Sequence, residues 1–395
     1  MTVADPAALA DLVGRLRDAL AGDPRLGIDT EFIRERTYAP VLEIVQVAAD
    51  GGKLVAVIDV PALGGDLGGL GALLLDPGVL KILHAGGQDM EILQSLLGAP
   101  PAPVFDTQVA AAFAGWGTQT GYGALVQAVL NVRLSKEEGF ADWSRRPLTP
   151  AMLDYAENDV RYLHALHDRL LRLLTRAGRV AWAEEQTARL LRGAAEDLPP
   201  RELWRRVGGR SVLDGRGLAI LRELAAWRDG EARRRDKPRR SVVKDDVLVE
   251  IARRVPKTAT AVLALRGVPQ NLGEKTAQAL ADVVRAGLAV PEAERPHVES
   301  SPPLDEQGAA LVELLSAVVR ARALQENLPP ALLATQDDLR ALAAARRRSD
   351  LPAHPLFAGW RGALIGDALR EVLAGRLAAR WDPTQGRLVL TETAD

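Results

Sequence analysis

Three apolar runs near the N-terminus constrain the fold of this chain more than any other feature. The runs are Leu26–Phe32, Val41–Ala48 and Lys53–Asp59, and the turn Asp50–Gly52 joins the last two. An Asp-Gly turn between apolar runs is typical of a β-hairpin. Two shorter apolar runs, Leu80–Leu83 and Pro103–Phe105, each precede a helical pattern. Strands that then alternate with helices predict an α/β domain in which helices flank a mixed sheet.

Beyond Arg201 the strand signals nearly vanish, and the pattern predicts helices. Proline-rich, acidic breaks at Glu196–Arg201 and Val290–Leu304 predict linkers. We therefore expect an α/β domain over residues 1–195, a helical domain over 210–292 and a second, diverged helical copy over 305–380. The two helical segments resemble each other because each opens a helix with an Asp pair, at Asp245 and at Asp337. Helix capping is the ordinary explanation of such pairs.

The composition narrows the chemistry that the chain can carry out. The sequence has no cysteine and only five histidines, which excludes thiol nucleophiles and cysteine-ligated zinc and disfavours a histidine-rich metal site. A metal bound here should be a hard cation with oxygen ligands. The N-terminal sequence MTVADPAALADLV lacks a basic stretch before an apolar core, and no apolar run approaches the length of a bilayer span. These features predict a cytoplasmic protein without a membrane partner.

Two carboxylates stand in the first long apolar run. Asp29 and Glu31 are two residues apart in a predicted strand, which places both side chains on one face. Uncompensated carboxylates among apolar neighbours are costly to bury, and a bound cation would remove that cost. A solvated sheet edge is the alternative interpretation.

Further acids follow at positions where they could join this pair. Asp89 comes after the run Leu80–Leu83 and the loop HAGGQ, at the start of a predicted helix. Tyr155 and Asp159 are four apart in a helical stretch and therefore share a face. Taken singly, Asp89 is explained as a helix cap, and Tyr155 with Asp159 as an exposed helix pair.

The order of these motifs resembles the DEDD exonuclease superfamily, tyrosine subtype, and within it the ribonuclease D family. The resemblance runs from about Ile28 to Leu171 and includes IDTEF, LEIVQVA, KILHAGGQDMEIL, FDTQVAAAF, GYGALVQAVL, DWSRRPLT and YAENDVRYL. It implies a ribonuclease H-like exonuclease fold. The histidine subtype would need histidine at position 154, where this chain has aspartate.

The resemblance implies a catalytic set of Asp29, Glu31, Asp89, Tyr155 and Asp159, in which the four carboxylates bind metal. Two divalent cations about 3.5–4 Å apart would grip the attacking and leaving oxygens of a phosphodiester. Mg²⁺ suits such a site, and Mn²⁺ would also fit. A phenol with a pKa of about 10 is a poor base at neutral pH, so we expect Tyr155 to orient the attacking water.

Candidate nucleic-acid contacts lie outside this set. Phe32 could stack on the terminal base or belong to the core. Residues 215–290 resemble the HRDC domain, with Leu218, Leu221 and Leu224 on an apolar helix face. A basic cluster follows that helix, and either phosphate contact or a solvated loop explains it. The cluster consists of Arg233, Arg234, Arg235, Lys237, Arg239 and Arg240.

Three other polar positions have a structural and a functional interpretation. Asp106 follows an apolar run, and we expect it to form structural hydrogen bonds. Arg145 and Arg146 precede the Tyr155 helix, where they could touch phosphate or simply lie on a surface.

The function implied by the resemblance is 3′→5′ exoribonuclease activity that releases nucleoside 5′-monophosphates. Expected partners are RNA substrates, namely tRNA precursors and other small structured RNAs, and we expect the chain to act as a monomer. Nothing in the motifs themselves reads the 2′-hydroxyl. A DNA exonuclease and a non-catalytic nucleic-acid-binding protein therefore stay open as alternatives.

Overall fold

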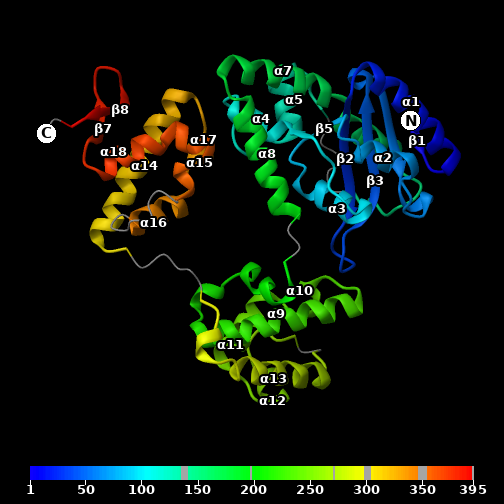
Figure 1. Cartoon of the computed structure of the whole chain (residues 1–395). Helices are drawn as coiled ribbons and strands as arrows, with labels where there is room; N and C mark the ends of the chain where they lie inside the picture. The colour runs from blue at the N-terminus through cyan, green and yellow to red at the C-terminus, as the bar shows by residue number, and fades with distance from the viewer. Residues whose placement is uncertain (135–140, 196–197, 270–271, 298–303, 346–353, 394–395) are drawn as a thin grey trace. The chain divides into compact units, whose positions relative to one another are not determined.

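The computed structural model describes six stretches of the chain, residues 1–134, 141–195, 198–269, 272–297, 304–345 and 354–393. The chain divides into two compact units. Figure 1 colours the chain by residue number from the N-terminus to the C-terminus. One unit comprises Met1–Glu31, Leu42–Ala195 and Ser301–Asp395, and the other comprises Phe32–Val41 and Glu196–Ser300. Each unit contains its own hydrophobic core.

A mixed six-stranded sheet is the centre of the first unit. Its strands are β1 (Thr2–Val3), β2 (Arg25–Ile33), β3 (Val41–Ala49), β4 (Leu54–Asp59), β5 (Leu80–Leu83) and β6 (Val104–Asp106). They lie in the order β1-β4-β3-β2-β5-β6. Strand β3 runs antiparallel to β4, whereas β1 is parallel to β4, and β5 is parallel to both β2 and β6. The predicted mixed sheet is confirmed, and the short β1 is an addition to it.

The β3–β4 hairpin shows how the local sequence sets the register. Its turn is a short 3₁₀ segment, η1 (Asp50–Gly52), with φ of 64° at Gly51 and 90° at Gly52. A β-carbon at Gly52 would lie 2.2 Å from the carbonyl oxygen of Arg161. Glycine is therefore required at position 52 both for the positive φ and for the close approach of a neighbouring helix end.

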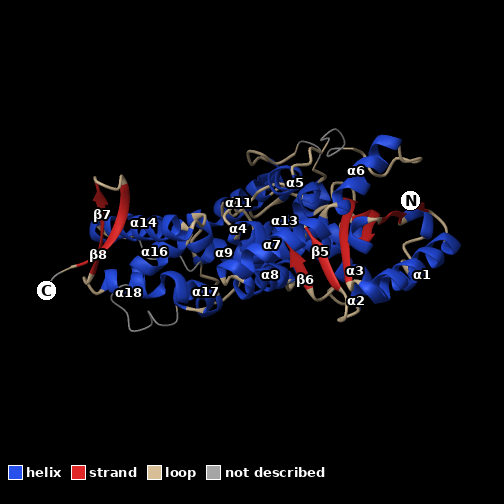
Figure 2. Cartoon of the chain, turned by 90° about the horizontal axis from the view of Figure 1, so that it is seen from above, coloured by secondary structure: helices blue, strands red, loops and turns tan. Residues whose placement is uncertain are grey.

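Helices flank this sheet, as the two cartoon views show (Figures 1 and 2). They are α1 (Pro6–Gly22), α2 (Gly68–Leu75), α3 (Gly87–Leu97), α4 (Thr107–Phe113), α5 (Tyr122–Leu130), α6 (Pro150–Arg161), α7 (Leu163–Ala177) and α8 (Val180–Ala195), with η2 (Pro61–Leu63) before α2. Ile44 of β3 packs with Met152 and Ala156 of α6. Ala48 of the same strand packs with Val160. Helix α6 therefore covers the face of β3 that carries Ile44 and Ala48.

The second unit is helical. Its elements are η3 (Pro200–Arg206), η4 (Arg210–Val212), α9 (Gly215–Arg235), α10 (Arg239–Val242), α11 (Asp245–Arg254), α12 (Ala259–Leu263), α13 (Glu274–Leu288) and η5 (Glu292–Glu294). Leu218, Leu221 and Leu224 of α9 are buried in its core, as the apolar pattern predicts. The connection between β2 and β3, Phe32–Val41, belongs to this unit, and Tyr38 packs against the core.

The C-terminal elements belong to the first unit. They are α14 (Glu306–Glu326), α15 (Pro330–Leu333), α16 (Gln336–Ala345), η7 (Pro355–Phe357), α17 (Gly359–Arg361), the π-helical turn η8 (Gly362–Gly366), α18 (Asp367–Leu373), β7 (Leu377–Asp382) and β8 (Arg387–Glu392). They share one hydrophobic core with α4, α5, α7 and α8. The Phe113 and Trp360 rings lie 4.9 Å apart at this junction. A second HRDC-type domain stays a prediction, and the antiparallel hairpin β7–β8 was not predicted.

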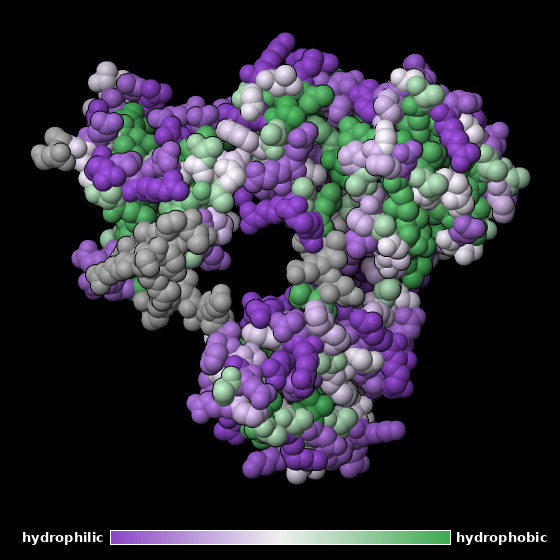
Figure 3. All heavy atoms as spheres, in the orientation of Figure 1, coloured by the Kyte–Doolittle hydropathy of each residue, from purple (hydrophilic) through white to green (hydrophobic). Residues whose placement is uncertain are grey.

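The surface that Figure 3 displays is mainly hydrophilic, with hydrophobic areas interspersed. Among the described residues, no helix combines the length and the apolar character needed to cross a membrane.

Candidate metal centre

Strand β2 carries Asp29 and Glu31 on the face that α6 covers. The neighbouring position on this face is Gly27, where a β-carbon would lie 3.4 Å from both Ala48 Cβ and the Val160 carbonyl oxygen. Gly27 thus lets the end of α6 approach the strand closely. Because side chains alternate along a strand, Asp29 and Glu31 share the face of Gly27, as the sequence predicts.

Helix α6 supplies the third carboxylate. Thr149 caps the helix by accepting from the Met152 amide, and Pro150 occupies the first turn. Met152, Ala156 and Val160 face the core. Carboxylate oxygens of Asp29, Glu31 and Asp159 all lie within 4.8 Å of one another, and the three residues are partly buried. Residues more than a hundred positions apart in the chain therefore form one acidic cluster.

Asp89 lies beside this cluster. It stands in the first turn of α3, is buried, and accepts a hydrogen bond from the Thr30 hydroxyl. It is not among the three residues that meet within 4.8 Å, yet its charge contributes to raising the pKa of both Asp29 and Glu31. Gly86, not Asp89, is the N-cap of α3, so a simple capping role does not account for Asp89.

The loop before Asp89 is fixed by Asp106. Its carboxylate accepts from the backbone amides of Ala85 and Gly86, each at 3.1 Å. The same side chain caps α4 by accepting from the Gln108 amide at 2.8 Å. The structural hydrogen-bonding role expected for Asp106 is confirmed.

Desolvation and mutual repulsion raise the pKa values of the three carboxylates in this cluster. Desolvation, followed by the charges of Asp89, Asp159 and Glu31, raises the pKa of Asp29 well above its usual range. Desolvation and the charges of Asp159 and Asp89 raise the pKa of Glu31 to about 8. Desolvation also raises the pKa of Asp159 to about 7. Over the described stretches, no lysine or arginine forms an ion pair with these three carboxylates. Such a set of hard oxygen donors fits divalent cations.

Tyr155 lies one turn before Asp159 on α6, and its ring is 6.2 Å from that of Trp143. Desolvation and the charges of Asp159, Glu31 and Asp29 raise the pKa of its phenol well above the ordinary value. The hydroxyl therefore stays protonated at neutral pH, where it can donate a hydrogen bond.

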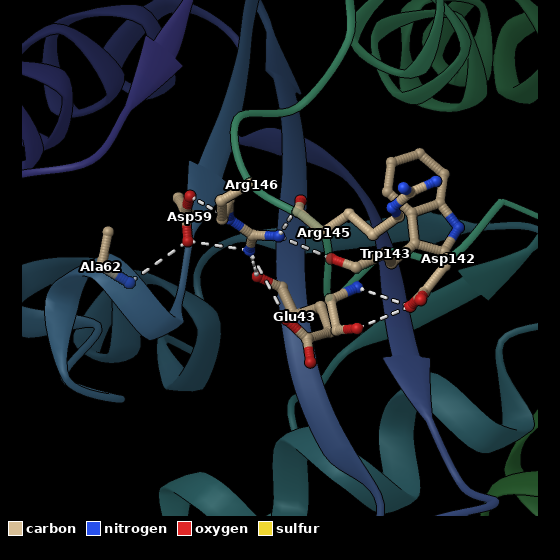
Figure 4. Close-up of polar contacts among 8 residues, drawn as sticks. Glu43, Asp59, Ala62, Asp142, Trp143, Arg145 and Arg146 are labelled. Atoms are coloured by element: carbon tan, nitrogen blue, oxygen red, sulfur yellow. Dashed lines mark hydrogen bonds and ion pairs between the residues drawn. The ribbon is translucent and has the colours of Figure 1, made fainter.

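Arg146 fastens the segment that precedes α6 to the sheet (Figure 4). Its guanidinium binds the carboxylate of Asp59 on β4 through two contacts, Nε–Oδ2 at 2.5 Å and Nη2–Oδ1 at 2.9 Å. It also donates to the Trp143 carbonyl oxygen at 2.6 Å and lies 3.5 Å from the Glu43 carboxylate. Arg146 thus anchors this segment through its guanidinium contacts, and the neighbouring Arg145 is exposed.

Comparison with known proteins agrees with this geometry. Residues 1–175 match a family model described as 3'-5' exonuclease, and residues 217–284 match the HRDC domain. Ribonuclease D of Acidiphilium cryptum is 39% identical over 369 residues, which cover 93% of this chain and 92% of the relative. The chain belongs to the ribonuclease D family. Ribonuclease D of Granulibacter bethesdensis is also 39% identical, with coverage of 94% and 93%.

A solved member of the ribonuclease D family has the same fold over nearly the whole chain. It is Escherichia coli RNase D, described as an exoribonuclease involved in structured RNA processing. The TM-score is 0.82 at 28% identity, covering 95% of this chain and 98% of that one. As a member of the ribonuclease D family, this chain is a nuclease that hydrolyses RNA, and its family implies divalent metal ions.

The basic cluster predicted for nucleic acid is partly neutralised by ion pairs within the second unit. Asp229, whose side chain is 1% exposed, binds Arg233 at 2.9 Å and Arg239 at 2.6 Å. Glu231 pairs with both Arg234 and Arg235. Of these side chains, Arg240 is 80% exposed and approaches Asp245 at 3.4 Å. The backbone brings the cluster together, but much of its charge serves internal ion pairs.

Tyr38 completes the Asp229 network, and sequence reasoning missed it. Its hydroxyl donates to Asp229 at 2.7 Å, and the guanidinium groups of Arg233 and Arg239 lie 4.9 and 4.8 Å from its ring centre. Phe32, at the start of the same connection, has the Arg34 guanidinium 5.0 Å from its ring centre. A stacking role for Phe32 stays a prediction.

Proposed function

We propose that this enzyme removes nucleotides from RNA 3′ ends by hydrolysis, with two divalent cations held by Asp29, Glu31, Asp89 and Asp159. The observation that carries the proposal is the convergence of carboxylates from β2 and α6 without a cationic partner among the described residues. Ionised carboxylates this close repel one another, so the cluster must either bind protons or have its charge offset by cations. Mg²⁺ is the preferred ion of the proposal because it favours oxygen ligands and retains water.

The bound cations would supply the positive charge that stabilises the phosphate during displacement. In the hydrolysis a water oxygen forms a bond to phosphorus, and the bond from phosphorus to the 3′ oxygen of the preceding nucleotide breaks. The released nucleotide keeps its 5′ phosphate, so the product is a nucleoside 5′-monophosphate. The Tyr155 hydroxyl would orient the attacking water by hydrogen bonding, because its raised pKa keeps it protonated at neutral pH and leaves no phenolate to accept a proton.

The proposed substrates are tRNA precursors and other small structured RNAs, acted on in the cytoplasm by a single chain. Two observations support this choice: the HRDC match at residues 217–284 and the likeness to the E. coli enzyme, which is described as processing structured RNA. A helical module that holds the RNA body would leave the sheet domain to hydrolyse its end.

The decisive test is degradation of a 3′-extended tRNA with Mg²⁺ present and with a chelator in its place. We expect Asp29→Asn and Asp159→Asn to fold normally and to lose at least about 10²–10³-fold in kcat, the scale for removing a group that stabilises transition-state charge. Asp154→Asn is the matched control, because Asp154 is exposed on the same helix. It should retain full activity.

The same assay separates the alternatives. An RNA with a blocked 3′ end should resist the enzyme, and a DNA oligomer of the same sequence should be degraded more slowly. Equal degradation of DNA would favour a DNA exonuclease, and digestion that the chelator leaves unchanged would remove the metal-dependent proposal. Turnover retained in Asp29→Asn would exclude the site itself.

A further inference from the structure

Gln46 is a polar residue at the centre of an apolar strand. It lies on β3, pairs with Val57 of β4 and is 0% exposed. Its strand neighbours Val45 and Val47 are also fully buried. Ile44 and Ala48, two positions to either side, pack against α6. Because side chains alternate along a strand, Gln46 points toward the same α6-covered face.

The register of the sheet places Gln46 opposite Asp29. Strands β2 and β3 are neighbours, and the short connection between them requires an antiparallel pair, since parallel strands need a longer crossover. A β-carbon at Gly27 would lie 3.4 Å from Ala48 Cβ, so these two positions face each other. Because the strands are antiparallel, moving two residues forward along β2 and two residues back along β3 places Asp29 opposite Gln46. Directly opposed side chains have β-carbons about 4.5–5.5 Å apart.

The Gln46 amide has no hydrogen-bond partner within the described parts of the protein, at either Nε2 or Oε1. A buried amide with neither group bonded costs folding free energy, and valine or leucine would fill a strand centre without that cost. An amide beside a carboxylate cluster can, however, donate to a carboxylate oxygen. The Nε2 group of Gln46 is therefore an unused hydrogen-bond donor opposite the carboxylate of Asp29, which can accept.

We propose that Gln46 is a positioning residue for the metal centre. Its Nε2 group would donate to one Asp29 oxygen and leave the other oxygen directed toward a cation. The inference rests on the proposed function, because it assumes that Asp29 binds metal. Residues that orient metal ligands in this way commonly contribute about 10–100-fold to metal affinity or activity.

The test compares Gln46→Met with the wild-type enzyme in two measurements. Methionine matches glutamine in length and removes both unbonded polar groups, so thermal stability in chelator should stay equal or rise. Mn²⁺ affinity, measured by calorimetric titration without RNA, should fall by about 10–100-fold. The kcat value should fall with it, while KM for RNA changes little. Gln46→Leu provides a second apolar variant in case the first folds poorly.

Gln186→Leu is the matched control. Gln186 lies on α8, and its Oε1 is likewise buried without a hydrogen-bond partner. Its replacement should leave Mn²⁺ affinity unchanged. The inference is overturned if Gln46→Met binds Mn²⁺ as the wild type does. It is also overturned if stability and Mn²⁺ affinity fall together, as they would if the amide only bonded an internal water. If the wild-type enzyme does not bind Mn²⁺ or does not hydrolyse RNA, the proposed function is refuted instead.

Discussion

At the scale of single residues, protons and metal ions compete for the same carboxylates. The pKa of Glu31 rises from 4.5 to about 8, and that of Asp159 from 3.8 to about 7, because both groups are desolvated and Glu31 also faces neighbouring negative charge. Without metal, the folded protein therefore holds protons that the unfolded chain has already released. Its stability should fall as the pH rises through this window, and it should level off above the folded pKa values.

This first prediction is measured as the unfolding temperature in chelator from pH about 5 to about 8. Adding Mg²⁺ should raise the unfolding temperature more at the upper end of the range, where the carboxylates are ionised and free to bind it. Glu31→Gln should flatten the dependence in chelator. A wild-type unfolding temperature that does not decline with pH, or that matches Glu31→Gln throughout, would contradict the electrostatic description of the cluster.

The same scale shows which site residues the sequence could reveal. The alternation of β2 placed Asp29 and Glu31 on one face, and helical spacing joined Tyr155 to Asp159. Thr30 as the partner of Asp89, and Gln46 as the neighbour of Asp29, depend on strand register and on the position of α3. Neither of these two contacts can be predicted from the sequence of a single segment. A lone glutamine inside the run LEIVQVA was nevertheless a visible signal.

At the scale of elements, the segment before α6 is held by one bidentate ion pair. Arg146 has a side chain 29% exposed and Asp59 one 9% exposed, so the Asp59 carboxylate is largely shielded from solvent. Removing the Arg146 guanidinium leaves the buried Asp59 carboxylate uncompensated. Arg146→Gln should therefore destabilise the protein by about 3 kcal/mol, near the lower end for a broken buried pair.

Chemical denaturation followed by circular dichroism measures this second prediction. Arg145→Gln is the adjacent control. Its side chain is exposed, so the expected change is within about 0.5 kcal/mol. If the two substitutions cost the same free energy, the anchoring role of Arg146 is wrong.

Element boundaries were predictable where a local pattern was strong. The β3–β4 hairpin followed from its Asp-Gly turn, and the helical character of α6 followed from the spacing of Tyr155 and Asp159, although its end at Arg161 was not predicted. The hairpin β7–β8 was missed because most of its residues are only partly buried or exposed, so hydrophobic alternation is weak. Arg146 could not be assigned from sequence, because its partner Asp59 lies on a distant strand.

At the scale of the whole molecule, ion pairing limits what the basic cluster can offer to RNA. Arg233 and Arg239 share the buried Asp229, so their first role is to hold the second unit together. Summing arginines along the sequence overstated the available charge. Asp229 and Glu231 lie one turn from the arginines at the end of α9, and Asp229 also binds Arg239 of α10. Lys237 and Arg240 are exposed and remain the better candidates for phosphate contact.

The third prediction therefore concerns Lys237→Ala combined with Arg240→Ala, measured by fluorescence anisotropy on a structured RNA in the inactive Asp29→Asn background. Two lost phosphate contacts should lower the slope of log affinity against log salt by about 1.4–1.8, at about 0.7 for each contact to a single strand and about 0.9 for each contact to a duplex. Arg285→Ala is the control, since Arg285 is exposed and already paired with Asp282 in the same unit. Hydrolysis of short oligomers by the otherwise active double variant should be unchanged, because the metal centre is untouched. An unaltered salt slope would show that these side chains do not contact RNA.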